Sequence, residues 1–226
     1  MKFGILQFPG SCDDRDAVEA ARNVADAELI WHRDRDLRGA DAIIVPGGFS
    51  YGDYLRAGAI ARFSPAMESV IDFAREGGLV LGICNGFQVL CEAHLLPGAL
   101  LPNVNLRFTF RQVELDVVAP DTAFTRACPP GRRLSVPAKH SWGRYHADEP
   151  TRRAMQESGQ VVLRYAPGHN FNGSLDDIAG VSNEAGNVFG LMPHPEHAVD
   201  ELTGGSADGL AIFESIRLAV DGVVPA

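Results

Sequence analysis

One cysteine lies in a sequence context that favours a nucleophile. Cys84 is the middle residue of Gly82-Ile83-Cys84-Asn85-Gly86, which follows the apolar run 79–83 and precedes a segment with helical spacing, 87–95. A strand, a sharp turn and a helix in this order expose one side chain at a sheet edge, and small flanking residues give the turn room. Free N–H groups at the helix start favour the thiolate. The alternative is an inert core cysteine, against which the flanking pattern argues.

A thiol nucleophile needs a base, and the base needs a group that orients it. His194 lies in Met192-Pro193-His194-Pro195-Glu196-His197, directly after the apolar run 188–191. Prolines stiffen the loop on both sides, and Glu196 can bend back to the imidazole. The motif therefore predicts His194 as base and Glu196 as its orienting acid, with a solvated surface loop as the alternative. Metal ligation is disfavoured because the prolines exclude the helical spacing of zinc-protease histidines.

A glycine pair after another apolar run could supply oxyanion donors. Pro46-Gly47-Gly48-Phe49 follows the run 41–45, at the same sheet edge as Cys84 if the strands are parallel. We expect N–H groups of Gly48 or Phe49, together with that of Asn85, to face a developing oxyanion. A Gly-Gly turn is usually only a turn, so this inference depends on Cys84. The nucleotide-binding patterns Gly-x-x-x-x-Gly-Lys-Ser/Thr and Gly-x-Gly-x-x-Gly are absent from the sequence.

The elements that must position these residues form an α/β pattern. Apolar runs at 3–8, 27–31, 41–45 and 79–83 are separated by segments of helical length, which predicts a parallel sheet with crossover helices. The ranges 13–25, 65–76 and 208–220 have the apolar spacing of amphipathic helices. Five strand-like runs, 113–118, 134–138, 161–165, 178–182 and 188–192, predict an antiparallel extension. No repeat or linker divides the chain, so residues 1–226 are predicted to form one domain.

Composition narrows the class of protein. The chain has 226 residues, 46% of them hydrophobic, and a net charge of −9. These values suit a globular domain, and the negative charge disfavours binding to nucleic acid or to an anionic membrane. No apolar run reaches the roughly 20 residues of a membrane helix, and residues 1–10 are too short for a signal peptide. A cytoplasmic protein is therefore expected.

The remaining cysteines carry no signature of their own. Cys12, Cys91 and Cys128 form no Cys-x-x-Cys pair, which argues against structural zinc and a disulfide framework. All three are expected to be core residues.

Together, the glycine pair, the cysteine turn and the His-Pro-Glu motif resemble the triad-type (class I) glutamine amidotransferases. The resemblance covers nearly the whole chain and implies a flavodoxin-like fold. Within this family, the chain resembles in particular the glutaminase subunits of one ATP-dependent synthetase of purine biosynthesis. Three segments carry this closer resemblance: Pro46-Gly-Gly-Phe-Ser-Tyr-Gly-Asp-Tyr-Leu-Arg56, Ile83-Cys-Asn-Gly-Phe-Gln88 and Asn187-Val-Phe-Gly-Leu-Met-Pro-His-Pro-Glu196.

This resemblance implies a reaction and partners. Cys84 would form a thioester with glutamine and release glutamate. Ammonia would pass to a synthetase large subunit that converts formylglycinamide ribonucleotide to formylglycinamidine ribonucleotide, in a complex with a small accessory subunit. ATP and Mg²⁺ would be bound by the synthetase, and this chain would need no cofactor. The glutamine contacts implied by the resemblance are Gln88, Asn105, Arg107 and Phe108.

The chain departs from the family pattern at three places. His140-Ser141-Trp142-Gly143-Arg144 stands where His-Gly-Glu-Gly is usual, His197 replaces a common arginine, and Phe171 a common proline. His140, His146 and His169 are expected to be solvated or to face a partner. Two rival interpretations remain open: a stand-alone cysteine hydrolase or peptidase of the same fold, and a catalytically silent interaction subunit.

Overall fold

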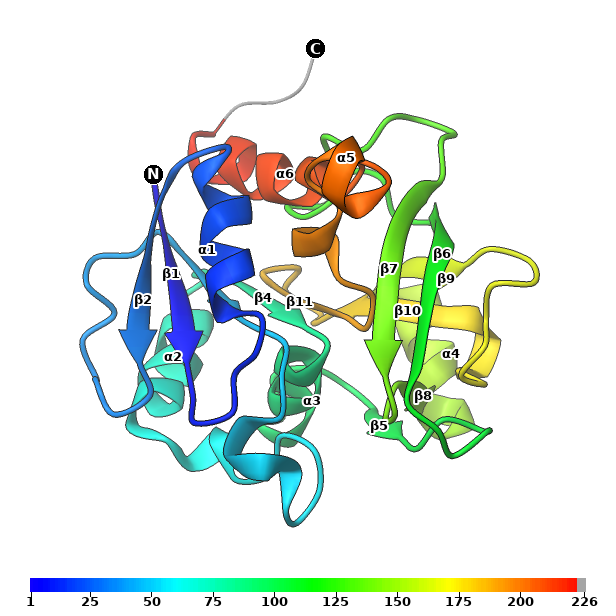
Figure 1. The fold of residues 1–226 in the computed structure, drawn as a ribbon, viewed down its shortest axis with the longest axis horizontal. Helices are drawn as coiled ribbons and strands as arrows, with labels where there is room; N and C mark the ends of the chain where they lie inside the picture. The colour runs from blue at the N-terminus through cyan, green and yellow to red at the C-terminus, as the bar shows by residue number, and fades with distance from the viewer. Residues whose placement is uncertain (223–226) are drawn as a thin grey trace.

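A single mixed β-sheet runs through the computed structural model, which describes residues 1–222 (Figure 1). Its nine strands are, in spatial order, β2 (Asp26–Trp31), β1 (Lys2–Gln7), β3 (Ala42–Val45), β4 (Leu79–Ile83), β11 (Val188–Leu191), β10 (Ile178–Ser182), β9 (Val161–Tyr165), β6 (Thr109–Val117) and β7 (Leu134–His140). A small separate pair is formed by β5 (Ala99–Leu101) and β8 (Arg144–His146).

The first half of the sheet is parallel. β1 pairs with β2 and β3, β3 pairs with β4, and β4 pairs with β11, all in parallel register. The order 2-1-3-4-11 is that of a flavodoxin-like doubly wound sheet, in which binding sites lie at the carboxyl ends of the strands. The α/β class and the four parallel runs predicted from the N-terminal third are confirmed.

The second half is antiparallel, through β10, β9, β6 and β7. Four of the five runs expected in the extension lie there. The fifth expectation was wrong, because the run 188–192 forms β11, which is parallel to β4 and buried throughout. A strand buried on both faces suits the parallel core, and this position has consequences for the site.

The helices are α1 (Asp14–Arg22), α2 (Pro65–Arg75), α3 (Asn85–Glu92), α4 (Glu149–Glu157), α5 (Glu201–Gly204) and α6 (Leu210–Val220). The start of α2 is capped: Oγ of Ser64 accepts a hydrogen bond from the N–H of Met67, and Pro65 occupies the first turn. Helix α4 is not predicted by the apolar spacing of the sequence. None of the helices in the described part of the chain is long and apolar enough to cross a membrane.

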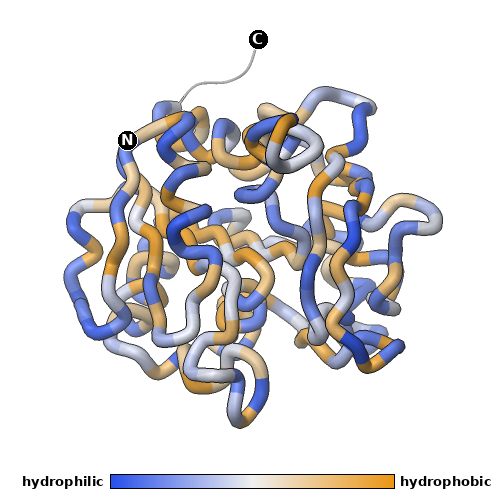
Figure 2. The backbone as a smooth tube through the Cα atoms, in the orientation of Figure 1, coloured by the Kyte–Doolittle hydropathy of each residue, from blue (hydrophilic) through white to orange (hydrophobic). Residues whose placement is uncertain are grey.

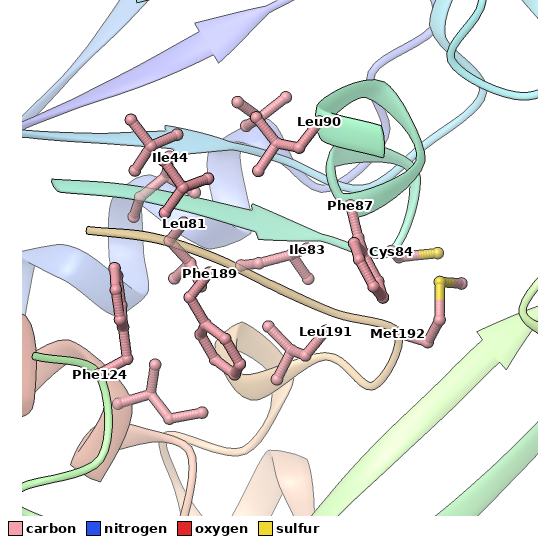
Figure 3. Packing of buried hydrophobic residues seen from close by; sticks show 14 of the residues in the cluster. Ile44, Leu81, Ile83, Cys84, Phe87, Leu90, Phe124, Phe189, Leu191 and Met192 are labelled. Carbon is pink, nitrogen blue, oxygen red and sulfur yellow. The ribbon is translucent and has the colours of Figure 1, made fainter. Parts of the chain in front are cut away.

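One hydrophobic core covers both halves of the sheet and the helices packed on it. Figure 2 shows hydrophobic residues along the central strands and hydrophilic residues on the surrounding loops. Ile44, Leu81 and Phe189, from three neighbouring strands, are fully buried in one cluster (Figure 3). Burial of each such side chain stabilises the fold by about 1.5–3 kcal/mol, because its apolar surface is removed from water. This packing holds the strand ends that carry the site.

Candidate active site

Cys84 stands on a strained turn between β4 and α3. Its φ of 50° and ψ of −104° lie outside the ordinary regions for a residue with a side chain. The turn also requires Gly86, since a Cβ there would lie 1.8 Å from the carbonyl oxygen of Val45. Figure 3 shows the Cys84 side chain at the end of β4. The strand, turn and helix expected around Cys84 are therefore present.

Neighbouring strands bring His194 to the same edge. Ile83 pairs with Leu191, and the N–H of Cys84 donates to the carbonyl of Leu191 at 2.9 Å. The chain then turns, and the N–H of His194 donates to the carbonyl of Pro137 on β7 at 2.8 Å. Nδ1 of His194 lies 2.6 Å from Oε1 of Glu196. The structure thus brings together the three residues predicted as nucleophile, base and orienting acid.

The buried His194 carries an unusual proton affinity. Burial alone would lower its pKa, but the carboxylate of Glu196 and the sulfur of Cys84 raise the pKa well above the ordinary value. Nε2 of His194 has no hydrogen-bond partner among residues 1–222. With Nδ1 committed to Glu196, Nε2 is the nitrogen available to exchange a proton at Cys84.

The amides at the glycine pair are not equivalent. The N–H of Phe49 donates to the carbonyl of Gly10 at 2.8 Å. The N–H groups of Gly48 and Asn85 donate to no other residue in the described part of the chain. Gly48 has φ of 142°, and a Cβ on it would meet the backbone of Ser11 and Cys12. The geometry therefore favours Gly48 and Asn85 over Phe49 as oxyanion donors.

A cavity of about 100 Å³ opens beside the cysteine. Its wall is formed by Cys12, Asp13, Gly48, Phe49, Asp53, Cys84, Gln88, Phe108, Lys139, His140, Ser141, Trp142 and His194. Gln88 is buried, donates to the carbonyl of Trp142 at 2.5 Å and accepts from Asn85 at 2.8 Å. Both ends of its amide are thus occupied in this conformation.

The stretch after β5 is only partly in the site. Phe108 lines the cavity, whereas Asn105 and Arg107 are exposed and outside it. The buried member of this stretch is Asn103, whose amide donates to the carbonyls of His140 and Arg107. Nothing in the sequence distinguishes Asn103 from its exposed neighbours, because its role depends on contacts with β7.

Two expectations about single residues were wrong. His140 is buried rather than solvated, with Nδ1 3.0 Å from Oδ1 of Asn103 and the ring stacked on Phe171. Burial and the charge of His194 lower the pKa of His140 to about 3, so the ring is neutral. Cys12 is exposed and lines the cavity, because the loop after β1 carries it to the sheet edge rather than into the core.

An ionic group that no sequence motif indicates lies beside His194. Asp13 lies 2.6 Å from Nζ of Lys139, 3.2 Å from Nε2 of His197 and 3.7 Å from Nδ1 of His194. The acids Asp13 and Glu196 and the two histidines could converge on a cation. The ammonium of Lys139 already neutralises one carboxylate, which makes this a poor metal site.

Comparison with known proteins agrees with this geometry. Residues 1–209 match the CobB/CobQ-like glutamine amidotransferase domain. The chain is 57% identical to phosphoribosylformylglycinamidine synthase subunit PurQ of Rubrobacter xylanophilus, over 96% of this chain and 97% of the relative. It is 56% identical to PurQ of Mycolicibacterium paratuberculosis, over 99% and 98%.

A solved structure supports the same assignment. A chain in the structure of PurLQS from Thermotoga maritima superposes with a TM-score of 0.88 at 43% identity, covering 97% of this chain and 98% of that one. The chain therefore belongs to the CobB/CobQ-like glutamine amidotransferase family and groups within it with the PurQ subunits of phosphoribosylformylglycinamidine synthase.

Proposed function

We propose that this chain is the glutaminase subunit of a phosphoribosylformylglycinamidine synthase, with Cys84 as nucleophile, His194 as acid–base and Glu196 as orienting acid. The observation that carries the proposal is the buried 2.6 Å contact between His194 and Glu196 at the sheet edge that also bears Cys84. The 57% identity to a PurQ subunit over nearly the full length supports the choice of reaction.

In the first half-reaction, the sulfur of Cys84 attacks the side-chain amide carbon of glutamine. A C–S bond forms, and the oxyanion of the tetrahedral intermediate faces the N–H groups of Gly48 and Asn85. When the C–N bond breaks, Nε2–H of His194 protonates the departing nitrogen, which leaves as ammonia. Cys84 is then held as a glutamyl thioester.

In the second half-reaction, water attacks the thioester carbon. His194, now neutral, takes a proton from the water at Nε2 while Glu196 stabilises the resulting imidazolium through Nδ1. The C–S bond breaks, glutamate leaves, and the sulfur of Cys84 is free beside the protonated His194. The same two nitrogens of His194 thus serve both halves.

Glutamine would occupy the cavity beside Cys84. Gln88 and Phe108 line this space and are the proposed contacts to the substrate. Asn105 and Arg107 lie on the exposed loop next to Phe108 and would contact glutamine only after that loop moves inward. Phe49 would contribute its side chain at the rim rather than its N–H.

Ammonia would be used by a separate synthetase. The similar Thermotoga maritima chain was solved in PurLQS, so we assign PurL-type and PurS-type proteins as the large synthetase subunit and the small accessory subunit. In this assignment ATP and Mg²⁺ are bound by the synthetase, the present chain needs no cofactor, and the complex works in the cytoplasm. One continuous hydrophobic cluster from Phe3 to Ile216 supports a single domain for the whole chain.

The test is glutamate release from glutamine by the chain mixed with the synthetase subunits, ATP and formylglycinamide ribonucleotide, run beside Cys84→Ala. Release that requires partner and acceptor and disappears in the variant is the expected result. Glutamine-independent hydrolysis of other amides would favour a stand-alone hydrolase. No release under any condition would favour a silent interaction subunit.

A further inference from the structure

Asp13 is a buried acid that none of the steps above uses. It lies in the loop between β1 and α1, and its side chain is 6% exposed. Oδ1 contacts Lys139 and His197, while Oδ2 faces Nδ1 of His194 at 3.7 Å. The same nitrogen donates to Glu196, so two carboxylates from distant parts of the chain face one imidazole.

The chain makes room for this approach at Gly47. A Cβ at Gly47 would lie 2.4 Å from Oδ2 of Asp13 and 2.9 Å from Cε1 of His194. The amides of Cys12 and Asp13 both donate to the carbonyl of Gly47, at 3.2 and 3.3 Å. Asp13 is therefore held against His194 by its own backbone, independently of its side-chain partners.

Lys139 connects this acid to the nucleophile. Its ammonium contacts Asp13, whereas its carbonyl oxygen accepts a hydrogen bond from Sγ of Cys84 at 3.9 Å. The charged or titratable groups around His194 come from four parts of the chain: Asp13, Cys84, Lys139 and His140 on β7, and Glu196 and His197. Apart from the titratable Cys84 and His197, and with His140 neutral, the charges near the ring are two carboxylates and one ammonium.

We propose that Asp13 is a second positioning residue for His194, and that Lys139 sets how strongly the charge of Asp13 acts on the imidazole. This inference deepens the proposed function and rests on His194 as its base. The net negative charge of these groups stabilises the imidazolium form of His194, which must protonate the leaving nitrogen. The pKa of Asp13 itself is lowered far below its ordinary value, because the pull of His197, His194 and Lys139 outweighs the effect of burial.

The proposal predicts opposite shifts for two substitutions. Asp13→Asn removes the negative charge and leaves Lys139 unpaired, so the pKa of His194 falls, by about one unit or more. Lys139→Met leaves Asp13 unneutralised, so the pKa of His194 rises. A loss of packing alone would not shift the pKa of His194 in opposite directions in the two variants. The matched control is Asp16→Asn, which makes the same change at an exposed position on α1.

The experiment is an NMR titration of the full chain with ¹³C-labelled histidine, following the Cε1 signal that His194→Gln removes. The expected result is a lower midpoint in Asp13→Asn, a higher one in Lys139→Met and an unchanged one in Asp16→Asn. Shifts in the same direction for the first two variants, or no shift in either, would overturn the proposal. If Asp13→Asn does not fold, the direction of the pKa shift of His194 in Lys139→Met decides whether the proposal holds.

This readout needs no turnover. A chain without glutaminase activity in the coupled assay would still yield the titration, so failure of the proposed function is seen separately. If the chain is active but the titration midpoint of His194 is the same in both variants as in the native chain, the proposed function stands and only the role of Asp13 is excluded.

Discussion

Nδ1 of His194 and Oε1 of Glu196 lie 2.6 Å apart, and both side chains are buried. This contact decides the tautomer, because a hydrogen on Nδ1 leaves Nε2 to act at Cys84. Oε2 of Glu196 has no hydrogen-bond partner among the described residues, whereas Oε1 lies 2.6 Å from Nδ1 of His194 and 3.6 Å from Nε2 of His197. The pair spans only two residues of sequence, yet it depends on the strand order that places β11 beside β4.

Glu196→Gln should lower the rate of glutamate release in the coupled assay by about 10²–10⁴-fold. The amide keeps the shape of the side chain but cannot stabilise the imidazolium that forms at His194. Kinetics of purified variants with saturating partner would measure this loss. Glu201→Gln, at an exposed position on α5, is the control and should retain the normal rate. A Glu196→Gln rate within a few-fold of normal would exclude the orienting role.

The raised pKa of His194 makes stability depend on pH. Its folded-state pKa lies above the value near 6.5 of an unfolded histidine, so the protonated ring stabilises the fold. That contribution is fully present below about pH 6.5 and is lost as pH rises through the folded-state pKa. Urea unfolding at pH 6 and at pH 9 would measure this. Between the two pH values, the free energy of unfolding should fall by more in the native chain than in His194→Gln. Equal losses would contradict the shift.

Gly86→Ala should disturb the turn that presents Cys84. The added Cβ would lie 1.8 Å from the carbonyl oxygen of Val45, so α3 must move away from β3. We expect a loss of about 1–3 kcal/mol in unfolding free energy, as for overpacked cores, together with a lower glutaminase rate. Gly159→Ala, at a position with φ of 72° and open space, should lose stability through backbone strain but keep the normal glutaminase rate. A normal glutaminase rate in Gly86→Ala would count against the clash.

The local signals of the site could be predicted from the sequence, whereas its tertiary contacts could not. Gly82–Gly86 and His194–Glu196 carry their roles in spacing and flanking residues. Their meeting could not be predicted in the same way, because the run before His194 was expected in the antiparallel extension, whereas β11 lies parallel to β4. Phe49 could not be separated from Gly48, since only the contact with Gly10 shows that its N–H is occupied.

The buried charges show the limit of sequence patterns more clearly. Asp13 precedes a second aspartate, and such a pair usually marks a solvated helix start. It is buried because the loop after β1 crosses the carboxyl edge of β3, a path set by the sheet. Lys139 alternates with inward-facing residues on β7, and only the fold brings its ammonium to Asp13. Neither residue has a motif, so sequence reasoning had no signal to follow.

The isolated chain should hydrolyse glutamine slowly, and the synthetase subunits should accelerate it by at least about 10-fold. The cavity beside Cys84 measures about 100 Å³ and is narrow for a substrate with two charged groups. The amide of Gln88, which would contact glutamine, is occupied by the carbonyl of Trp142. A contact between Gln88 and glutamine therefore requires the loop around Trp142 to move, and that residue and Phe108 are exposed at the rim, where a partner can reach them.

Glutamate release measured with and without the synthetase subunits checks this, with Cys84→Ala as the blank. The physical reason also predicts where the gain should appear. A partner that moves Trp142 frees Gln88 for the substrate, so the stimulation should include a lower KM for glutamine and not only a higher kcat. Gln88→Leu should lose that part of the stimulation while still binding the partner. Equal rates with and without the partner would show that the cavity admits glutamine unaided, and that the contact between Gln88 and Trp142 is no barrier.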